Sequence, residues 1–241
     1  FFLCLLIYDT INKNGVDKMI LIVEDDIAIQ ETLKELLCMK GYQVQQAYHM
    51  KEALLLDKSH IDVMIIDIHT HTFPDAIAYK TIASMEEDIV RGQGINVKSA
   101  RIPTVKGLED STKKADIDLS VVCPVATNIR QPEKINRLSV ELNEKREETR
   151  LFNFGAIHPD CENYKQIIDE IVAMDLKAIK IHPDYQNTFF DDEKYIRLMD
   201  YAAEKDLGII VHAGEDVGLP ETVHCTPERI LNLWKHIQPE K

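Results

Sequence analysis

The stretch VMIIDIHTHTFPD, residues 63–75, decides how the chain is interpreted, because an apolar strand runs directly into two histidines. The apolar run is typical of a strand that is covered on both faces of a sheet. His69 and His71 have the same parity in an extended strand, so their side chains point to one side. The spacing therefore predicts a pair of side chains that can hold one metal ion.

Segments with strand-like and helix-like patterns alternate on both sides of this stretch. The segments typical of strands are residues 19–23, 42–47, 61–67, 118–125, 151–159, 177–183 and 208–214. The segments with helical spacing of apolar residues are 27–40, 49–58, 76–90, 105–115, 132–148, 163–175, 192–206 and 226–237. This alternation predicts an α/β fold with parallel sheets, in which a β-α-β-α-β segment runs into five strand–helix units.

Composition and charge exclude several classes of partner. The 241 residues include 41 acidic and 28 basic side chains, and the net charge of −13 would repel nucleic acids and anionic membranes. The apolar residues 1–7 are too few to cross a bilayer, and no basic residue precedes them. Five scattered cysteines without a CxxC pair indicate a reducing cytoplasm. We expect a soluble cytoplasmic protein, with residues 1–18 as an extension of no assigned function.

Acidic residues follow two of the first strands. Glu24 and Asp25 end the run MILIVEDD, and Asp67 ends the third strand, so a parallel sheet would bring them to one edge. Residues 19–67 resemble the first half of the receiver domain of two-component response regulators, which is flavodoxin-like. The resemblance implies that Glu24 and Asp25 bind Mg²⁺ and that Asp67 accepts phosphate from a histidine kinase. The serine or threonine and the lysine of the later receiver strands are not found downstream.

Histidines also end three later strands. His158, His182 and His212 close the segments GAIHP, KIHP and IVHAG, and such strand ends converge in a (β/α) barrel. Residues 64–241 resemble the metal-dependent amidohydrolase superfamily of TIM-barrel hydrolases, most closely its amidohydrolase-2 branch, which also contains decarboxylases. The resemblance implies that His69, His71 and His212 bind a divalent metal, usually zinc. The metal would activate water against an amide or ester bond of a small-molecule substrate.

Four further residues are candidates for metal or substrate binding, and the sequence leaves more than one role open for most of them. Lys180 shares the face of His182 and is a candidate for the carboxylated lysine that bridges two metals in some members of the superfamily. It would otherwise pair with an acid or bind substrate. For His158 and His182, substrate contact and simple strand-end hydrogen bonding remain alternatives. His224 lies in the loop after the strand of His212, where residues that contact the substrate are often found.

The resemblance also implies residues that the sequence does not supply. The superfamily pattern requires a histidine on the sixth strand and an aspartate, the usual general base, on the eighth, and neither is found by Lys241. We therefore assign no catalytic residue and expect an incomplete barrel of about five units, shorter than the roughly 250 residues of a full one. The expected function is a metal-dependent hydrolase impaired by truncation. The alternatives are a phosphorelay receiver acting through Asp67 and a non-functional fusion.

Overall fold

The structure is a computed structural model that describes residues 4–12, 15–23, 43–47 and 64–237, together with positions 31, 34, 38 and 52. The chain forms two compact units. The first unit comprises Phe1–Thr70, Glu109–Val121 and Glu148–Leu151. The second unit comprises His71–Leu108, Val122–Glu147 and Phe152–Lys241. The division falls between Thr70 and His71, so the two histidines of the quoted stretch belong to different units.

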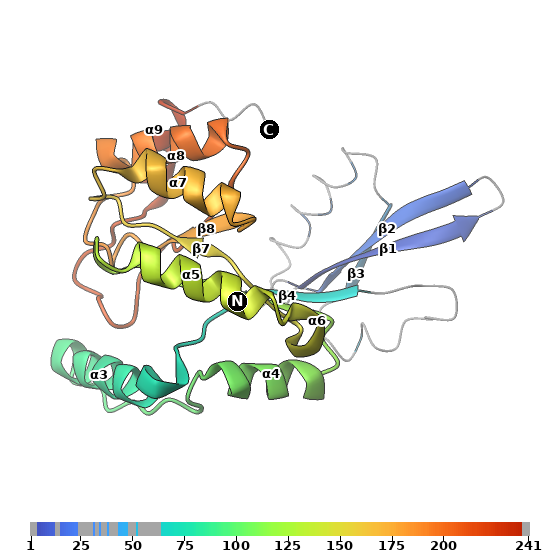
Figure 1. Cartoon of the computed structure of the whole chain (residues 1–241), viewed down its shortest axis with the longest axis horizontal. Helices are drawn as coiled ribbons and strands as arrows, with labels where there is room; N and C mark the ends of the chain where they lie inside the picture. Colours follow the sequence, from blue (N-terminus) through green and yellow to red (C-terminus); the bar gives the residue numbers. More distant parts are fainter. Residues whose placement is uncertain are drawn as a thin grey trace. The chain divides into compact units, whose positions relative to one another are not determined.

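A six-stranded mixed sheet has the order β3-β2-β1-β4-β5-β6. Its strands β1 to β4 lie in the first unit (Figure 1). Its strands are β1 (Cys4–Asn12), β2 (Gly15–Val23), β3 (Gln43–Ala47), β4 (Met64–Thr70), β5 (Leu119–Val122) and β6 (Leu151–Asn153). β1 is antiparallel to both of its neighbours, and Cys4 lies opposite Val23 in β2 and opposite Asp67 in β4. β2 and β3 are parallel.

The all-parallel β-α-β-α-β sheet expected for residues 19–67 is wrong. β1 separates β2 from β4, whereas the receiver arrangement would pair the equivalents of those two strands directly. The reason lies in residues 4–12, which were expected to be an extension. Only two residues separate them from β2, and a connection that short joins antiparallel strands, not parallel ones. Glu24, Asp25 and most of the helices expected over 27–40 and 49–58 lie outside the described residues.

A parallel three-stranded sheet with the order β7-β8-β9 lies in the second unit. Its strands are β7 (Gly155–Ala156), β8 (Ala178–Ile181) and β9 (Gly208–Val211). The helices of this unit are α3 (Asp75–Gln93), α5 (Pro132–Asn143), α7 (Tyr164–Ala173), α8 (Glu193–Glu204) and α9 (Pro227–Trp234). Two further helices, α4 (Val105–Lys114) and α6 (Arg146–Thr149), run across the division between the units.

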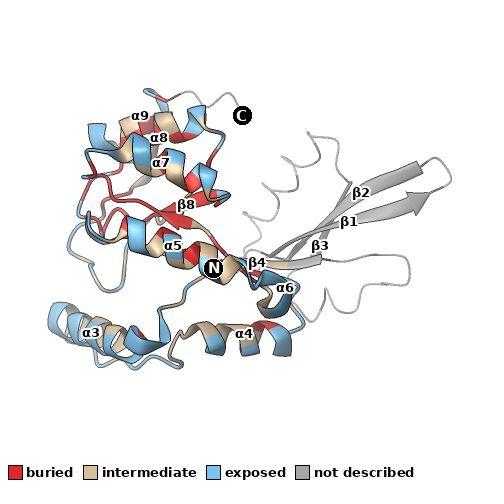
Figure 2. Cartoon of the chain, in the orientation of Figure 1, coloured by how far each residue is buried: buried red, intermediate tan, exposed pale blue. Residues whose placement is uncertain are grey.

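The core of the second unit surrounds β8, which is buried along its whole length (Figure 2). Its helices are amphipathic: α7 buries Ile168 and Ile171, and α8 buries Tyr195 and Leu198 in the same apolar cluster. The side chain of Asp192 caps α8 by accepting a hydrogen bond from the Lys194 backbone. The apolar faces of α7 and α8 therefore pack into one core with β8.

The α/β alternation is confirmed, and most elements expected from residue 76 onward are present with small shifts at their ends. The helix expected over 132–148 is divided into α5 and α6. The strand expected over 151–159 is divided into β6 and β7, which belong to different sheets. The strands expected to line one barrel are divided between two sheets, with β4, β5 and β6 in one and β7, β8 and β9 in the other. The described strands therefore form no closed barrel. Among the helices that the structure describes, none has the length and apolar character needed to cross a membrane.

Candidate metal centre

Three potential metal ligands converge where β8 and β9 end. His182 and Asp184 follow β8, His212 follows β9, and one donor atom from each lies within 4.8 Å of the others. The convergence follows from the register of the parallel strands, in which Ile181 lies opposite Val211. The His212 N–H donates to the Ile181 carbonyl at 3.0 Å, so the residues after both strands emerge side by side. Two imidazoles and a carboxylate are a donor set suited to Zn²⁺, Mn²⁺ or Fe²⁺.

The two imidazoles lie close together and nearly parallel. Their ring centroids are 4.0 Å apart and the rings are inclined by 8°. Burial, and then the neighbouring His182, lower the pKa of His212, so its ring is neutral near pH 7. A neutral imidazole is the form that binds a metal. The protonation state of His212 therefore fits a ligand.

Asp184 is held by the loop that follows β9. Its side chain is fully buried, and its Oδ1 accepts the backbone N–H of His224 at 3.0 Å and lies 3.0 Å from His224 Nδ1. Its Oδ2 has no hydrogen-bond partner among the described residues, and neither has His212 Nε2. A buried polar atom left without a partner costs about 1–3 kcal/mol. Two such atoms within one donor group fit a site that binds a cation.

The loop from His182 to Gln186 is fixed by the side-chain amide of Gln186, which is 3% exposed. Its Nε2 donates to the carbonyls of Ala126 at 2.8 Å and Ile157 at 2.7 Å. Its Oε1 accepts from the His182 N–H at 3.2 Å and from the Tyr195 hydroxyl at 2.7 Å. These four bonds saturate the amide. Gln186 thus ties the loop that carries His182 and Asp184 to α8 and to the segments after β5 and β7.

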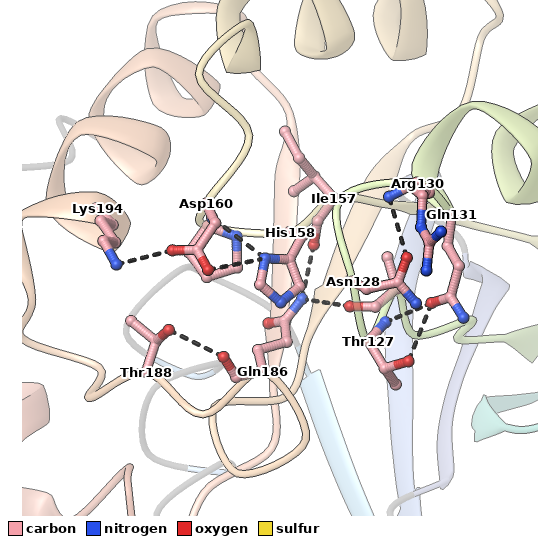
Figure 3. A network of polar contacts seen from close by, with 12 residues as sticks. Thr127, Asn128, Arg130, Gln131, Ile157, His158, Asp160, Gln186, Thr188 and Lys194 are labelled. Atoms are coloured by element: carbon pink, nitrogen blue, oxygen red, sulfur yellow. Dashed lines mark hydrogen bonds and ion pairs between the residues drawn. The ribbon is translucent and has the colours of Figure 1, made fainter.

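His158 and Lys180 are buried but do not belong to the donor group. His158 Nδ1 accepts from the Asp160 N–H at 3.2 Å, and the Asp160 carboxylate binds Lys194 at 2.7 Å (Figure 3). Burial is the main cause that lowers the pKa of His158. Lys180 is fully buried in β8, and burial lowers its pKa as well. This hydrogen bond of His158 Nδ1 corresponds to one of the two alternatives that the sequence left open for His158.

The residues expected at the end of β4 have different surroundings. His71 is exposed, and its Nδ1 lies 2.9 Å from the Cys123 carbonyl in the second unit. His69 and Asp67 belong to the first unit, where the exposed His69 donates its backbone N–H to Asp67 Oδ1 at 3.3 Å. Burial raises the pKa of Asp67. The donor group of His212 does not include His71, and phosphorylation of Asp67 stays a prediction from the sequence.

Sequence reasoning missed Asp184, Gln186 and Asp216. Asp216 lies in the loop after β9, and its Oδ2 is 3.4 Å from His182 Nε2. A signal for Asp184 was present, because KIHPD places it two residues after His182, the same spacing that drew attention to His69 and His71. His224 was expected to contact substrate, and in the structure it supports Asp184.

No protein-family model matches the sequence, and the comparison with curated proteins found no match. Solved structures similar to the chain include 5-carboxyvanillate decarboxylase from Novosphingobium aromaticivorans with bound manganese (14% identity, 63% of this chain, 51% of that chain, TM-score 0.48). The decarboxylase of the same name from Sphingomonas paucimobilis is similar at 13% identity, over 66% of this chain and 57% of that chain, with a TM-score of 0.48. A putative amidohydrolase from Staphylococcus aureus is similar at 14% identity, over 63% of this chain and 48% of that chain, with a TM-score of 0.43. The chain spans about half the length of these structures, and such weak similarities assign no activity to it.

Proposed function

We propose that the protein is a metal-dependent hydrolase in which His182, Asp184 and His212 bind a divalent cation. The observation that carries the proposal is the convergence of three donor atoms within 4.8 Å. Two atoms of these side chains, Asp184 Oδ2 and His212 Nε2, are buried without a hydrogen-bond partner in the described part of the chain. Three protein ligands of this kind leave positions on the cation for water and substrate, as catalytic sites require.

A divalent cation bound there would lower the pKa of a coordinated water and polarise a substrate carbonyl. The side chains around the ligands have protonation states suited to such chemistry. Contact with His182 is the main cause that lowers the pKa of Asp216, so Asp216 is a carboxylate at neutral pH. Burial raises the pKa of Tyr185 to about 12, so its hydroxyl keeps its proton and can donate a hydrogen bond. The Tyr185 ring packs against His182, with centroids 4.3 Å apart.

The resemblance of residues 64–241 to amidohydrolases supports a hydrolase or decarboxylase of a small molecule, and it favours a different ligand set. The ligand set implied by the resemblance consists of His69, His71 and His212. The proposed set keeps His212 but has His182 and Asp184 in place of the other two histidines. We favour the second set because its donors converge within one compact unit. Zinc follows from the resemblance, while a set of two nitrogens and one oxygen also accepts manganese.

The proposal is tested by elemental analysis of the chain after chelation and reloading with Zn²⁺ or Mn²⁺. We expect about one equivalent in the wild type, a loss in His182→Ala and in His212→Ala, and retention in the His69→Ala, His71→Ala double variant. Retention in His182→Ala with a loss in the double variant would assign the metal to the end of β4. A wild type that binds neither metal would overturn metal-dependent function. The loaded protein is then assayed against amides, esters and aromatic carboxylic acids.

A further inference from the structure

Asp216 lies beside His182 and His212, two of the three ligands, and is held in place by its own loop. The chain turns after β9 at Gly214, which has a φ of 91°, a conformation that favours glycine. Asp216 Oδ1 then accepts the Gly218 N–H at 2.8 Å, and the Asp216 carbonyl accepts the Leu219 N–H at 3.0 Å. The side chain is 11% exposed. The carboxylate is therefore fixed, with its second oxygen directed at the metal site.

Asp216 Oδ2 is shared between the two histidines. It lies 3.4 Å from His182 Nε2 and 3.8 Å from His212 Nε2. Both distances exceed the 2.7–3.2 Å or so that is usual for an N–H···O hydrogen bond. Two ligands bound at about 2.1 Å to one cation lie roughly 3.0–3.5 Å apart in octahedral or tetrahedral geometry. The distance from Asp216 Oδ2 to His182 Nε2 lies in this range, and the distance to His212 Nε2 lies slightly above it.

The charges of Asp184 and Asp216 also favour a bound cation. Asp184 follows β8 and Asp216 lies in the loop after β9, so the ends of both strands supply a carboxylate. A carboxylate that is removed from water needs a positive charge or hydrogen-bond donors beside it. A divalent cation would neutralise both and would satisfy Asp184 Oδ2 and His212 Nε2, the two atoms without a hydrogen-bond partner among the described residues.

We infer that Asp216 is a fourth ligand, so that the site binds its cation through two histidines and two aspartates. This inference rests on the proposed function, because it assumes that His182, Asp184 and His212 bind the cation. It also bears on the choice of metal. Four protein ligands fill the coordination sphere of a tetrahedral Zn²⁺, whereas a six-coordinate cation such as Mn²⁺ keeps positions open for water and substrate.

The test is a titration of the metal-free full chain with Co²⁺, whose visible absorption reports on the atoms that bind it. Three proteins are compared: the wild type, Asp216→Asn and Glu215→Gln. Glu215 is the matched control, because it is the adjacent residue, is exposed and loses the same charge. We expect Asp216→Asn to bind Co²⁺ about 10–100-fold more weakly, with shifted absorption bands. Glu215→Gln should match the wild type in both respects.

The two proposals fail in different ways. A wild type that binds no Co²⁺ overturns the proposed function and the fourth ligand with it. A wild type that binds Co²⁺, together with an Asp216→Asn variant whose bands are unchanged, overturns only the fourth ligand, whether or not affinity falls. A weaker affinity with unchanged bands would mean that Asp216 is an ion-pair partner of His182. If the asparagine variant does not fold, Asp216→Glu takes its place: retained binding with shifted bands supports ligation, and unchanged bands contradict it.

Discussion

The strand ends of β4 and of β8 and β9 each present two histidines, but the two places differ in how the side chains are held. At β4, His69 and His71 are exposed, although their spacing on one strand is the more familiar pattern. At β8 and β9, His182 is buried and lies within reach of the carboxylates of Asp184 and Asp216. Spacing along a strand sets only which way two side chains point. A site also needs contacts from distant segments that fix those side chains.

The largest difference in metal affinity and stability between the two strand ends is expected when Asp184 and His71 are each replaced by alanine. Asp184→Ala removes a proposed metal ligand, which is buried, and the acceptor for the His224 N–H. We expect metal affinity to fall by about 100-fold or more and the free energy of unfolding to fall by about 2–3 kcal/mol. His71→Ala should change the free energy of unfolding by about 1 kcal/mol or less, because the side chain is exposed. Metal titration and urea denaturation measure both effects, and a larger loss of metal in His71→Ala would reverse the comparison.

The next effect concerns the amide that supports the ligand loop. Gln186→Glu keeps the shape of the side chain but replaces the donor to Ala126 and Ile157 with a carboxylate oxygen. We expect the free energy of unfolding to fall by about 2–4 kcal/mol and metal affinity to fall by about 10-fold. Urea denaturation measures the free energy of unfolding. Metal titration, carried out on samples with the same fraction of folded protein, measures the metal affinity independently.

Asn143 provides a matched control, because its side-chain amide also forms hydrogen bonds to backbone groups of a distant residue. Its Oδ1 accepts the Asn153 N–H at 2.6 Å and its Nδ2 donates to the Asn153 carbonyl at 3.0 Å. Asn143→Asp should destabilise the fold by about 1–3 kcal/mol and leave metal affinity unchanged. An equal loss of affinity in both variants would show that Gln186 acts only through general stability.

The helices and strands of the second unit could be predicted because their apolar residues recur with a clear period. In α7, Ile168 and Ile171 are three residues apart and both are fully buried, as a helix facing a core requires. The order of the strands could not be predicted in the same way. Nothing in the spacing of residues 4–12 specifies that this segment pairs with both β2 and β4.

The site was only partly predictable for a related reason. His212 could be identified because it directly follows an apolar strand, and His182 follows another. Asp216 lies four residues after His212, in a loop whose path depends on Gly214 and on the bond from the Gly218 N–H. Side chains of loop residues reach a site through tertiary contacts, so no periodic pattern marks them.

A smaller effect is expected when one hydroxyl of the Gln186 network is removed. Tyr195 is fully buried and its hydroxyl donates to Gln186 Oε1 at 2.7 Å. Tyr195→Phe should lower the free energy of unfolding by about 1–1.5 kcal/mol. Tyr79 is 69% exposed, and Tyr79→Phe should stay within about 0.5 kcal/mol of the wild type. Equal effects in urea denaturation would show that the Tyr195 hydroxyl does not contribute through this bond.

The smallest effect concerns the pH dependence of stability at His158, which ends a strand as His182 does. Burial lowers the pKa of His158 below its ordinary value of 6.5, although Asp160 opposes the shift. Above pH 6.5 the ring is neutral in both folded and unfolded chains, so its contribution to stability is complete. As the pH falls from there through the lowered pKa, the unfolded chain binds the proton first and stability is lost. His158→Gln should therefore lose less stability between about pH 7 and pH 5 than the wild type. Replacing the exposed His236 by glutamine is the control, and an equal change of slope in both variants would rule out burial of His158 as the cause.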